Sequence, residues 1–283
     1  MIGVSRSALL VMAVGLGIVA ACASVETPDG TVGLVDGESR GRLIEIVRVI
    51  DGDSLEVLVG NEEIEVRLVG INAPERFTLA DHETCVGQEA RAALDEVLSA
   101  AGELRLQGEE VDRFDRLLAD INADGHSVNK TMVELGWALA LWSAGAPALT
   151  EAMMKAAADG QGWWGSTCGL AVATLEISDH QVDPPGRDDE NLDQEWVEVH
   201  NPGSDPIDLD QWTIRDETTS NRFPLPAMTL GPGASLRVHT GSGSDSSTDL
   251  YLGDRFPVWS NRGESVLILD GEGRIAAYTF IEG

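Results

Sequence analysis

The sequence predicts an α+β domain followed by an all-β domain, and three observations lead to this prediction. The chain has 283 residues, which is enough for two domains that each bury a core. Between residues 42 and 169, strand-like alternation is mixed with apolar residues at helical spacing. After Cys168 the helical patterns end, and short strand-like segments recur between turns rich in Pro, Gly and Asp. We therefore predict domains at residues 42–169 and 170–283.

The first 22 residues differ from the rest of the chain. Met1 to Ala21 contains a single charge, and residues 8–21 form an unbroken run of apolar residues and glycine. A short basic start before about 14 such residues is typical of a secretory signal, and it is short for a membrane span. Residues 19–22, Val-Ala-Ala-Cys, resemble a bacterial lipobox, which implies cleavage before Cys22 and a lipid on its sulfur. An ordinary signal peptide with an incidental cysteine is the alternative.

We expect an exported lipoprotein, held by this lipid on the cell surface or in the periplasm. Residues 23–41 are rich in Gly, Asp, Thr and Ser and predict a flexible linker. The other two cysteines are Cys85 and Cys168, an even pair that favours a disulfide in an oxidising compartment. Such a bond would stabilise the fold by about 4 kcal/mol in the chain-entropy model. Two buried free thiols are the alternative.

The net charge of −29 argues against nonspecific electrostatic capture of nucleic acid. Both predicted domains are acidic: residues 42–169 carry 10 Lys and Arg against 23 Asp and Glu, and residues 170–283 carry 7 against 21. A broad basic patch is therefore excluded. Any binding of phosphate has to depend on a few placed arginines.

In the first domain, the sequence predicts five strands and three helices. Segments rich in β-branched or alternating apolar residues predict the strands, at residues 43–50, 54–59, 64–69, 104–106 and 116–121. Apolar residues at helical spacing predict the helices, at residues 88–98, 128–137 and 147–159. These elements fit a small barrel with helices packed against it. In the second domain, strands expected at 173–177, 196–200, 212–214, 235–239 and 265–269 fit a β-sandwich.

Three motifs in the first domain carry its chemistry: Ile-Asp-Gly-Asp-Ser at 50–54, Arg-Leu-Val-Gly-Ile-Asn-Ala-Pro-Glu at 67–75, and Asp-Arg-Phe-Asp-Arg at 112–116. Together, and in this order, they resemble the thermonuclease (staphylococcal-nuclease-like) family. Segments 87–90, 124–129 and 163–165 also fit that family. The resemblance implies an OB-fold, that is, a five-stranded barrel with three helices, and hydrolysis of phosphodiester bonds in DNA or RNA.

The resemblance implies catalytic roles for Arg67, Glu75 and Arg116. Arginine suits a clamp on phosphate, because its planar fork donates to two oxygens and stays charged. A carboxylate at Glu75 would activate or orient the attacking water. Outside these motifs, Arg67 and Arg116 would be expected to be solvated strand residues, and Glu75 would be expected to be a turn residue.

The resemblance also implies Ca²⁺ as the cofactor, a cation that takes six to eight oxygen ligands. The implied ligands are Asp53, Asn72 and the backbone carbonyl of Ala73. Asn72 stands where the family has an aspartate, so one negative charge is lost and we expect weaker metal binding. Asp115 stands where the family usually has glycine. It tolerates left-handed backbone, and it could pair with Arg116 or Arg113 and weaken the phosphate clamp.

The second domain resembles the lamin-tail family, on the motifs at 195–203, 207–212, 230–233 and 258–261. This implies an immunoglobulin-like β-sandwich with a binding or tethering role for a ligand that the sequence does not identify. We expect a monomeric, anchored, extracellular calcium-dependent nuclease. A catalytically weak or inactive surface protein that binds nucleic acid or another ligand is the first alternative. A structural lipoprotein that acts through its second domain is the other.

Overall fold

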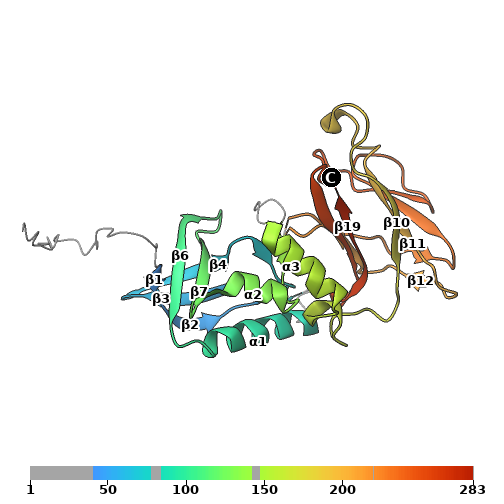
Figure 1. Ribbon diagram of the computed structural model, residues 1–283. Helices are drawn as coiled ribbons and strands as arrows, with labels where there is room; N and C mark the ends of the chain where they lie inside the picture. Colours follow the sequence, from blue (N-terminus) through green and yellow to red (C-terminus); the bar gives the residue numbers. More distant parts are fainter. Residues whose placement is uncertain (1–40, 78–83, 142–146, 219, 283) are drawn as a thin grey trace, which may run out of the picture. The chain divides into compact units, whose positions relative to one another are not determined.

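The structure is a computed structural model that describes residues 41–77, 84–141, 147–218 and 220–282. The expected signal peptide, Cys22 and nearly all of the expected linker lie outside the described residues. The element order follows the prediction, with a mixed first part and an all-β second part (Figure 1). No helix in the described part of the chain is long and apolar enough to cross a membrane.

The first part is built on a seven-stranded sheet with the order β1-β6-β7-β4-β3-β2, and β8 pairs with β7. Its strands are β1 (Arg42–Leu43), β2 (Glu45–Val49), β3 (Ser54–Val59), β4 (Glu62–Leu68), β6 (Leu104–Val111), β7 (Leu117–Ala123) and β8 (His126–Ser127). The pairing of β4 with β7 is parallel, and the others are antiparallel.

This arrangement is consistent with the expected OB-fold, although the hydrogen-bonded path of the strands does not close into a ring. Its two ends, β1 and β2, are successive segments separated only by Ile44. The backbone N–H of Ile44 donates to the carbonyl of Leu104 over 3.1 Å. The segment expected as one strand therefore turns at Ile44 and pairs with β6 on one side and β3 on the other.

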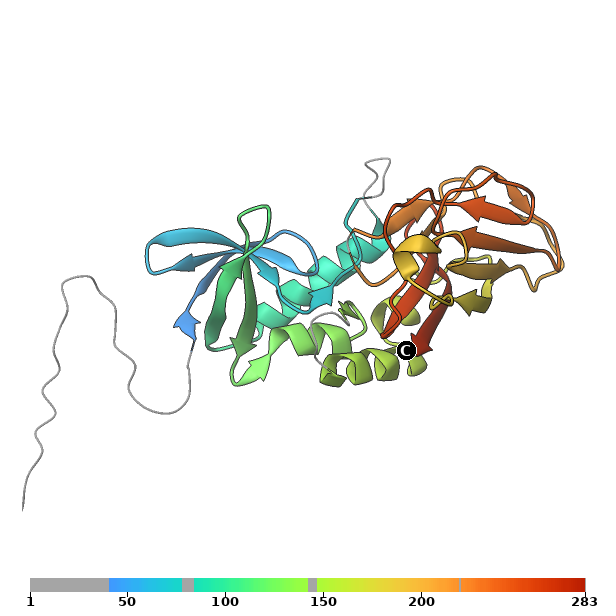
Figure 2. The same ribbon diagram turned by 90° about the horizontal axis from the view of Figure 1, so that it is seen from above.

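The three expected helices are present: α1 (Cys85–Ser99), α2 (Val128–Glu134) and α3 (Pro147–Ala158) (Figure 2). Helix α1 contacts β2, α2 contacts β7, and α3 packs on α2. Helix α1 begins three residues earlier than predicted, because Thr84 Oγ1 caps it by accepting from the N–H of Gly87 over 3.1 Å. Helix α2 ends earlier than predicted, shortly before Gly136, whose φ of +75° suits glycine. A small two-stranded sheet pairs β5 (Ile71–Asn72) with β9 (Leu139–Ala140).

The second part has two four-stranded sheets around an apolar core, consistent with the expected sandwich. One sheet has the order β10-β11-β16-β17, with β10 (Glu176–Gln181), β11 (Trp196–His200), β16 (Ser235–His239) and β17 (Asp249–Tyr251). The other has the order β14-β13-β18-β19, with β14 (Arg222–Pro224), β13 (Thr213–Arg215), β18 (Gly263–Leu269) and β19 (Ile275–Glu282). Strands β12 (Ile207–Asp208) and β15 (Thr229–Leu230) pair separately.

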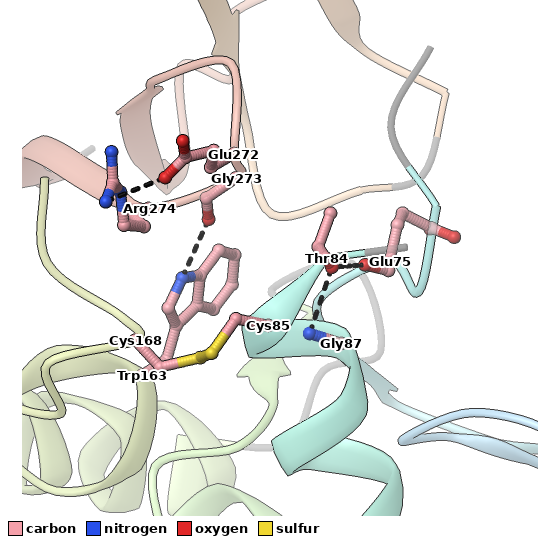
Figure 3. Close-up of a disulfide and its surroundings, with 9 residues drawn as sticks. All are labelled: Glu75, Thr84, Cys85, Gly87, Trp163, Cys168, Glu272, Gly273 and Arg274. Atoms are coloured by element: carbon pink, nitrogen blue, oxygen red, sulfur yellow. Dashed lines mark hydrogen bonds and ion pairs between the residues drawn. A yellow bond between two sulfur atoms is a disulfide. The ribbon is translucent and has the colours of Figure 1, made fainter. Parts of the chain in front are cut away.

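The two parts share apolar packing within one compact unit that begins at Arg40. Leu267, Leu269 and Ile275 of the second part belong to the core of the first. Trp163 lies in the short helix η2 (Gly162–Trp164), and its indole N–H donates to the carbonyl of Gly273 over 3.2 Å (Figure 3). The second part is therefore packed directly onto the first.

The expected disulfide between Cys85 and Cys168 is present, with 5.7 Å between the two Cα atoms (Figure 3). It joins the first residue of α1 to the segment that leaves the first domain. The bond therefore anchors the start of α1 beside the entry to the second domain.

Candidate active site

Arg67, near the end of β4, lies at the centre of a buried polar cluster. The β3–β4 ladder places Ser54 opposite Arg67, which brings the turn before β3 to the guanidinium. Arg67 Nη1 lies 2.8 Å from Asp53 Oδ2, and Nη2 donates to Asn72 Oδ1 over 3.0 Å. All these side chains are buried. The fork of Arg67 is therefore held by two predicted metal ligands.

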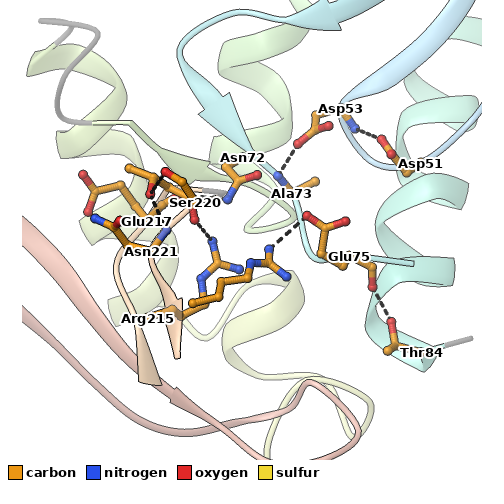
Figure 4. A network of polar contacts seen from close by, with 12 residues as sticks. Asp51, Asp53, Asn72, Ala73, Glu75, Thr84, Arg215, Glu217, Ser220 and Asn221 are labelled. Atoms are coloured by element: carbon orange, nitrogen blue, oxygen red, sulfur yellow. Dashed lines mark hydrogen bonds and ion pairs between the residues drawn. The ribbon is translucent and has the colours of Figure 1, made fainter. Parts of the chain in front are cut away.

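The turn that carries Asp53 is fixed on both sides. Asp53 Oδ1 accepts from the hydroxyl of Ser54 over 3.1 Å, and Oδ2 accepts from the N–H of Ala73 over 2.5 Å. Asp51 Oδ1 accepts from the N–H of Asp53 over 3.0 Å (Figure 4). A Cβ atom on Gly52 would lie 2.6 Å from the Cβ of Ala73, so only glycine allows this approach. The close approach brings Asp53 to the backbone of Ala73.

Burial raises the pKa of Asp53 to about 7, because desolvation disfavours the charged carboxylate. The positive charge of Arg67 is the largest opposing effect, and the N–H of Ala73 also lowers the pKa. The charges of Asp51 and Glu75 raise it further. One arginine therefore does not fully compensate this carboxylate, and an added cation would stabilise its charged form.

Arg116 immediately precedes β7 and joins the same cluster through Ser54. The parallel β4–β7 pairing sets Leu117 opposite Val66 and so places Arg116 near the end of β4. Its Nη1 lies 3.4 Å from Ser54 Oγ, a long contact. Its Nε and Nη2 lie 2.8 and 2.7 Å from Asp112 Oδ2. Two of the three guanidinium nitrogens of Arg116 therefore contact Asp112.

The turn between β6 and β7 corrects one expectation and confirms another. Asp115 has φ +64°, the left-handed conformation that explains why glycine is usual there. The carboxylate that pairs with Arg116 is Asp112 rather than Asp115. Asp112 Oδ1 also accepts from the N–H groups of Phe114 and Arg116. Desolvation raises the pKa of Asp112, but these hydrogen bonds outweigh it and the net shift is downward.

Glu75 follows β5 and is positioned by the start of α1. Its backbone carbonyl accepts from Thr84 Oγ1 over 2.5 Å (Figure 4). A Cβ atom on Gly87 would lie 2.3 Å from that carbonyl and 2.4 Å from the Cα of Arg76. The side chain of Glu75 is 39% exposed and forms an ion pair of 2.9 Å with Arg222 Nη2. The carboxylate is therefore both accessible and held in place.

The lamin-tail-like part reaches this site through the hairpin that joins β13 to β14. The side-chain amide of Asn72 donates to the backbone carbonyl of Glu217 over 2.8 Å. Arg222, at the start of β14, forms the ion pair with Glu75. Arg215, at the end of β13, is buried, and burial lowers its pKa to about 9, with the charge of Arg222 as the next cause. The second domain thus contributes polar groups to the cluster.

The predicted ligands fit a hard cation in chemistry, but they are few. Asp53, Asn72 and the carbonyl of Ala73 all offer oxygen, which Ca²⁺ prefers. Only Asp53 among them is ionisable, and Arg67 already contacts Oδ2 of Asp53 and Oδ1 of Asn72. Within the described ranges, no group of three or more Asp, Glu, His or Cys residues is placed to hold a metal ion. The fit is that of a weakly held cation.

All six residues predicted for catalysis and metal binding come together here. A continuous series of contacts runs from Arg116 through Ser54, Asp53 and Arg67 to Asn72. The sequence-based prediction did not include Ser54, Thr84, Asp112, Arg215, Glu217 or Arg222. Thr84 had a local signal, as a threonine three residues before Gly87 at a helix start. The residues of the second domain had none, since their position depends on packing between distant segments.

Comparison with known proteins agrees with the two halves of this architecture. Residues 65–166 match the family model of the staphylococcal nuclease homologue, and residues 170–282 match that of the lamin tail domain. Micrococcal nuclease from Shigella flexneri is 34% identical over 119 residues, which are 39% of this chain and 63% of that protein. An uncharacterized endonuclease from Haemophilus influenzae is 33% identical over 122 residues, which are 42% of this chain and 64% of that protein.

Endonuclease YncB from Bacillus subtilis is 29% identical over 114 residues, which are 38% of this chain and 52% of that protein. The chain thus spans between about half and two thirds of the length of these relatives. The matches cover the segment that holds Arg67, Glu75 and Arg116. The first part of the chain is therefore similar to staphylococcal nuclease homologues, and the second part is similar to lamin tail domains.

Proposed function

We propose that the protein is a calcium-dependent nuclease that hydrolyses phosphodiester bonds in DNA or RNA. The observation that carries this proposal is the single cluster formed by Asp53, Arg67 and Asn72, with Arg116 joined to it and Glu75 at its accessible edge. Relatives named as nucleases share this part of the chain.

The residues divide the reaction between them. Arg67 and Arg116 would bind the non-bridging oxygens of the scissile phosphate and stabilise its developing charge. Glu75 would orient a water molecule and take its proton, since its carboxylate is exposed at the edge of the cluster. A Ca²⁺ ion held by Asp53, Asn72 and the carbonyl of Ala73 would neutralise phosphate charge as a Lewis acid.

The ion pairs of both arginines also support a second candidate, a protein that binds nucleic acid and cuts it weakly. Arg67 is engaged by Asp53, and Arg116 is engaged by Asp112. A phosphate would have to share these donors or displace the carboxylates. The accessible carboxylate of Glu75 favours catalysis, since binding alone needs no such group.

We further propose that the N-terminal segment exports the chain and anchors it through a lipid on Cys22. The lamin tail domain would then act in binding or tethering, in addition to its contacts with the nuclease residues. Incorporation of a labelled fatty acid, compared between the wild-type chain and a Cys22→Ala variant, tests the anchor. Label in the variant equal to that in the wild type would contradict it.

Cleavage of single-stranded DNA by the purified protein tests the enzymatic proposal. We expect cutting in millimolar Ca²⁺ and none after addition of a chelator that binds calcium. Folded protein that binds the DNA but does not cut it under either condition would favour the second candidate. Parallel reactions with RNA identify the preferred nucleic acid.

A further inference from the structure

A pocket of about 730 Å³ lies beside Glu75, between the nuclease residues and the lamin tail domain. Pro74, Glu75 and Phe77 line it from the first domain, and Arg215 and Arg222 line it from the second. Its volume lies in the range typical of sites for small ligands. The pocket therefore continues the proposed active site into the second domain.

The two arginines of this pocket are not both paired with a carboxylate, and one of them has a donor without an acceptor. Arg215 is only 1% exposed, and its guanidinium donates to the backbone carbonyls of Asp216 and Thr218, each over 2.8 Å. No carboxylate in the described part of the chain forms an ion pair with it within 4.0 Å. The buried Nε of Arg222 has no acceptor among the described residues.

Two neighbouring guanidinium groups are unfavourable together without an anion. Desolvation and the charge of Arg222 both lower the pKa of Arg215, while Asp216, Glu75 and Glu217 oppose this only from a distance. Among the described residues, Arg222 forms an ion pair only with Glu75. A bound anion would compensate both groups, and the planar forks of arginine match the oxygens of a phosphate.

We propose that Arg215 and Arg222 form a second phosphate-binding subsite, which holds a phosphate next to the scissile one in the nucleic-acid strand. The inference rests on the proposed nuclease function, because a substrate with one phosphate per nucleotide supplies the neighbouring anion. Phe77 is half exposed on the same pocket and offers a face on which a base can stack. The lamin tail domain is then part of the substrate site.

An inhibitory role for the ion pair between Arg222 and Glu75 fits the structure less well. A latch would cover the carboxylate, whereas the side chain of Glu75 stays 39% exposed. The pocket also remains open beside it rather than filled by the hairpin. Arg222 is therefore placed to hold Glu75 and to meet substrate at the same time.

The test compares wild-type protein with Arg222→Gln and Arg222→Lys on two substrates. One is a single-stranded DNA oligonucleotide, and the other is a nitrophenyl ester of a nucleoside 5′-phosphate, which has one phosphodiester and no neighbouring phosphate. The matched control is Arg237→Gln, which removes the same charge from an arginine of β16 that does not line the pocket. Melting temperatures establish that each variant is folded.

We expect Arg222→Gln to raise KM for the oligonucleotide about tenfold or more, since a hydrogen-bonded charge contact is lost. Loss of the ion pair with Glu75 should also slow cleavage of the single-phosphodiester ester, but by a clearly smaller factor, since that substrate has no neighbouring phosphate. The slope of log binding constant against log salt should fall by about 0.7, the value for one contact to a single strand. Arg222→Lys should lie between these results and the wild type, because it keeps the charge and loses the fork.

Equal losses on both substrates would overturn the subsite, since Arg222 would then act only through Glu75 or through stability. Unchanged oligonucleotide binding, or an activity that rises in Arg222→Gln, would overturn it as well. The binding comparison does not need turnover. Wild-type protein that binds the oligonucleotide and fails to cut it would contradict the proposed function, while the salt slopes would still decide the subsite.

Discussion

The side-chain amide of Asn72 donates a hydrogen bond of 2.8 Å to the backbone carbonyl of Glu217, a residue 145 positions later in the chain. An aspartate, which the family resemblance implies at this position, could not donate this bond when ionised. The amide also accepts from Arg67 through Oδ1. The departure at Asn72 therefore has a structural reason in the contact between the two domains.

Replacing Asn72 with aspartate should lower the stability of the fold and raise its affinity for the metal. The new carboxylate would face the carbonyl of Glu217, so we expect the unfolding free energy in chelator to fall by about 1–3 kcal/mol. The added charge should increase the rise in melting temperature caused by Ca²⁺, compared with the wild type. Thermal unfolding of Asn72→Asp and Asn72→Ala, with and without Ca²⁺, measures both effects. Wild-type stability of Asn72→Asp in chelator would contradict the role of this hydrogen bond.

Adding a methyl group at Gly87 should disturb the position of Glu75. A Cβ atom there would lie 2.3 Å from the carbonyl of Glu75, so that α1 or the loop has to move. We expect Gly87→Ala to lower the unfolding free energy by about 1–3 kcal/mol and to reduce kcat. Gly231→Ala is the matched control, because nothing lies within 4 Å of its Cβ position. Equal kcat in Gly87→Ala and the wild type would show that this contact does not position Glu75.

The disulfide should stabilise the fold without being required for the chemistry itself. Cys85 and Cys168 lie 83 positions apart, and the chain-entropy model gives about 4–5 kcal/mol for a loop of this length. We expect a reducing agent to lower the denaturation midpoint of the wild type. The Cys85→Ser, Cys168→Ser double variant should have the lowered midpoint already and show no further change. A wild-type midpoint that reduction leaves unaltered would refute this contribution.

Glu264, buried in β18, should make stability depend on pH. Burial raises its pKa from 4.5 to about 9; a hydrogen bond from the N–H of Ser260 opposes this shift, and the charges of Asp216, Glu217 and Glu195 add to it. Because the folded-state pKa lies above the unfolded value, the folded state binds the proton more tightly. The stabilisation is fully present below pH 4.5 and is lost as pH rises towards about 9.

The variant Glu264→Gln keeps a side-chain oxygen for Ser260 and removes the titration. We therefore expect its melting temperature to fall less than that of the wild type between pH 5 and pH 9. The exposed residue Glu176 supplies the matched control, Glu176→Gln, which should follow the wild-type curve. Parallel curves for Glu264→Gln and the wild type would mean that Glu264 does not cause the dependence.

The strands with clear alternation or dense β-branched residues could be predicted from the sequence. The predicted segments 54–59, 196–200 and 235–239 coincide with β3, β11 and β16. Strand β19 was missed, since its start is rich in alanine, which is depleted in strands. The strand expected at 173–177 lies later, at β10, because its pairing with β11 sets its position.

The candidate site divides in a similar way between local and distant information. Motifs near one another in the chain predicted that Asp53, Arg67 and Asn72 would meet, and they do. The contact between Arg222 and Glu75 joins residues that are 147 positions apart, and it depends on how the two domains pack. No local pattern encodes such a contact, so only the structure could reveal it.

Cleavage of single-stranded DNA by wild-type protein and Glu75→Gln in millimolar Ca²⁺ tests the central claim most directly. Glutamine keeps the size of the side chain and can still meet Arg222, but it cannot take a proton from water. We expect kcat to fall about 100-fold or more, with DNA binding within a few-fold of the wild type. Equal cleavage rates for the two proteins would contradict the account, because Glu75 could then not be the residue that activates water.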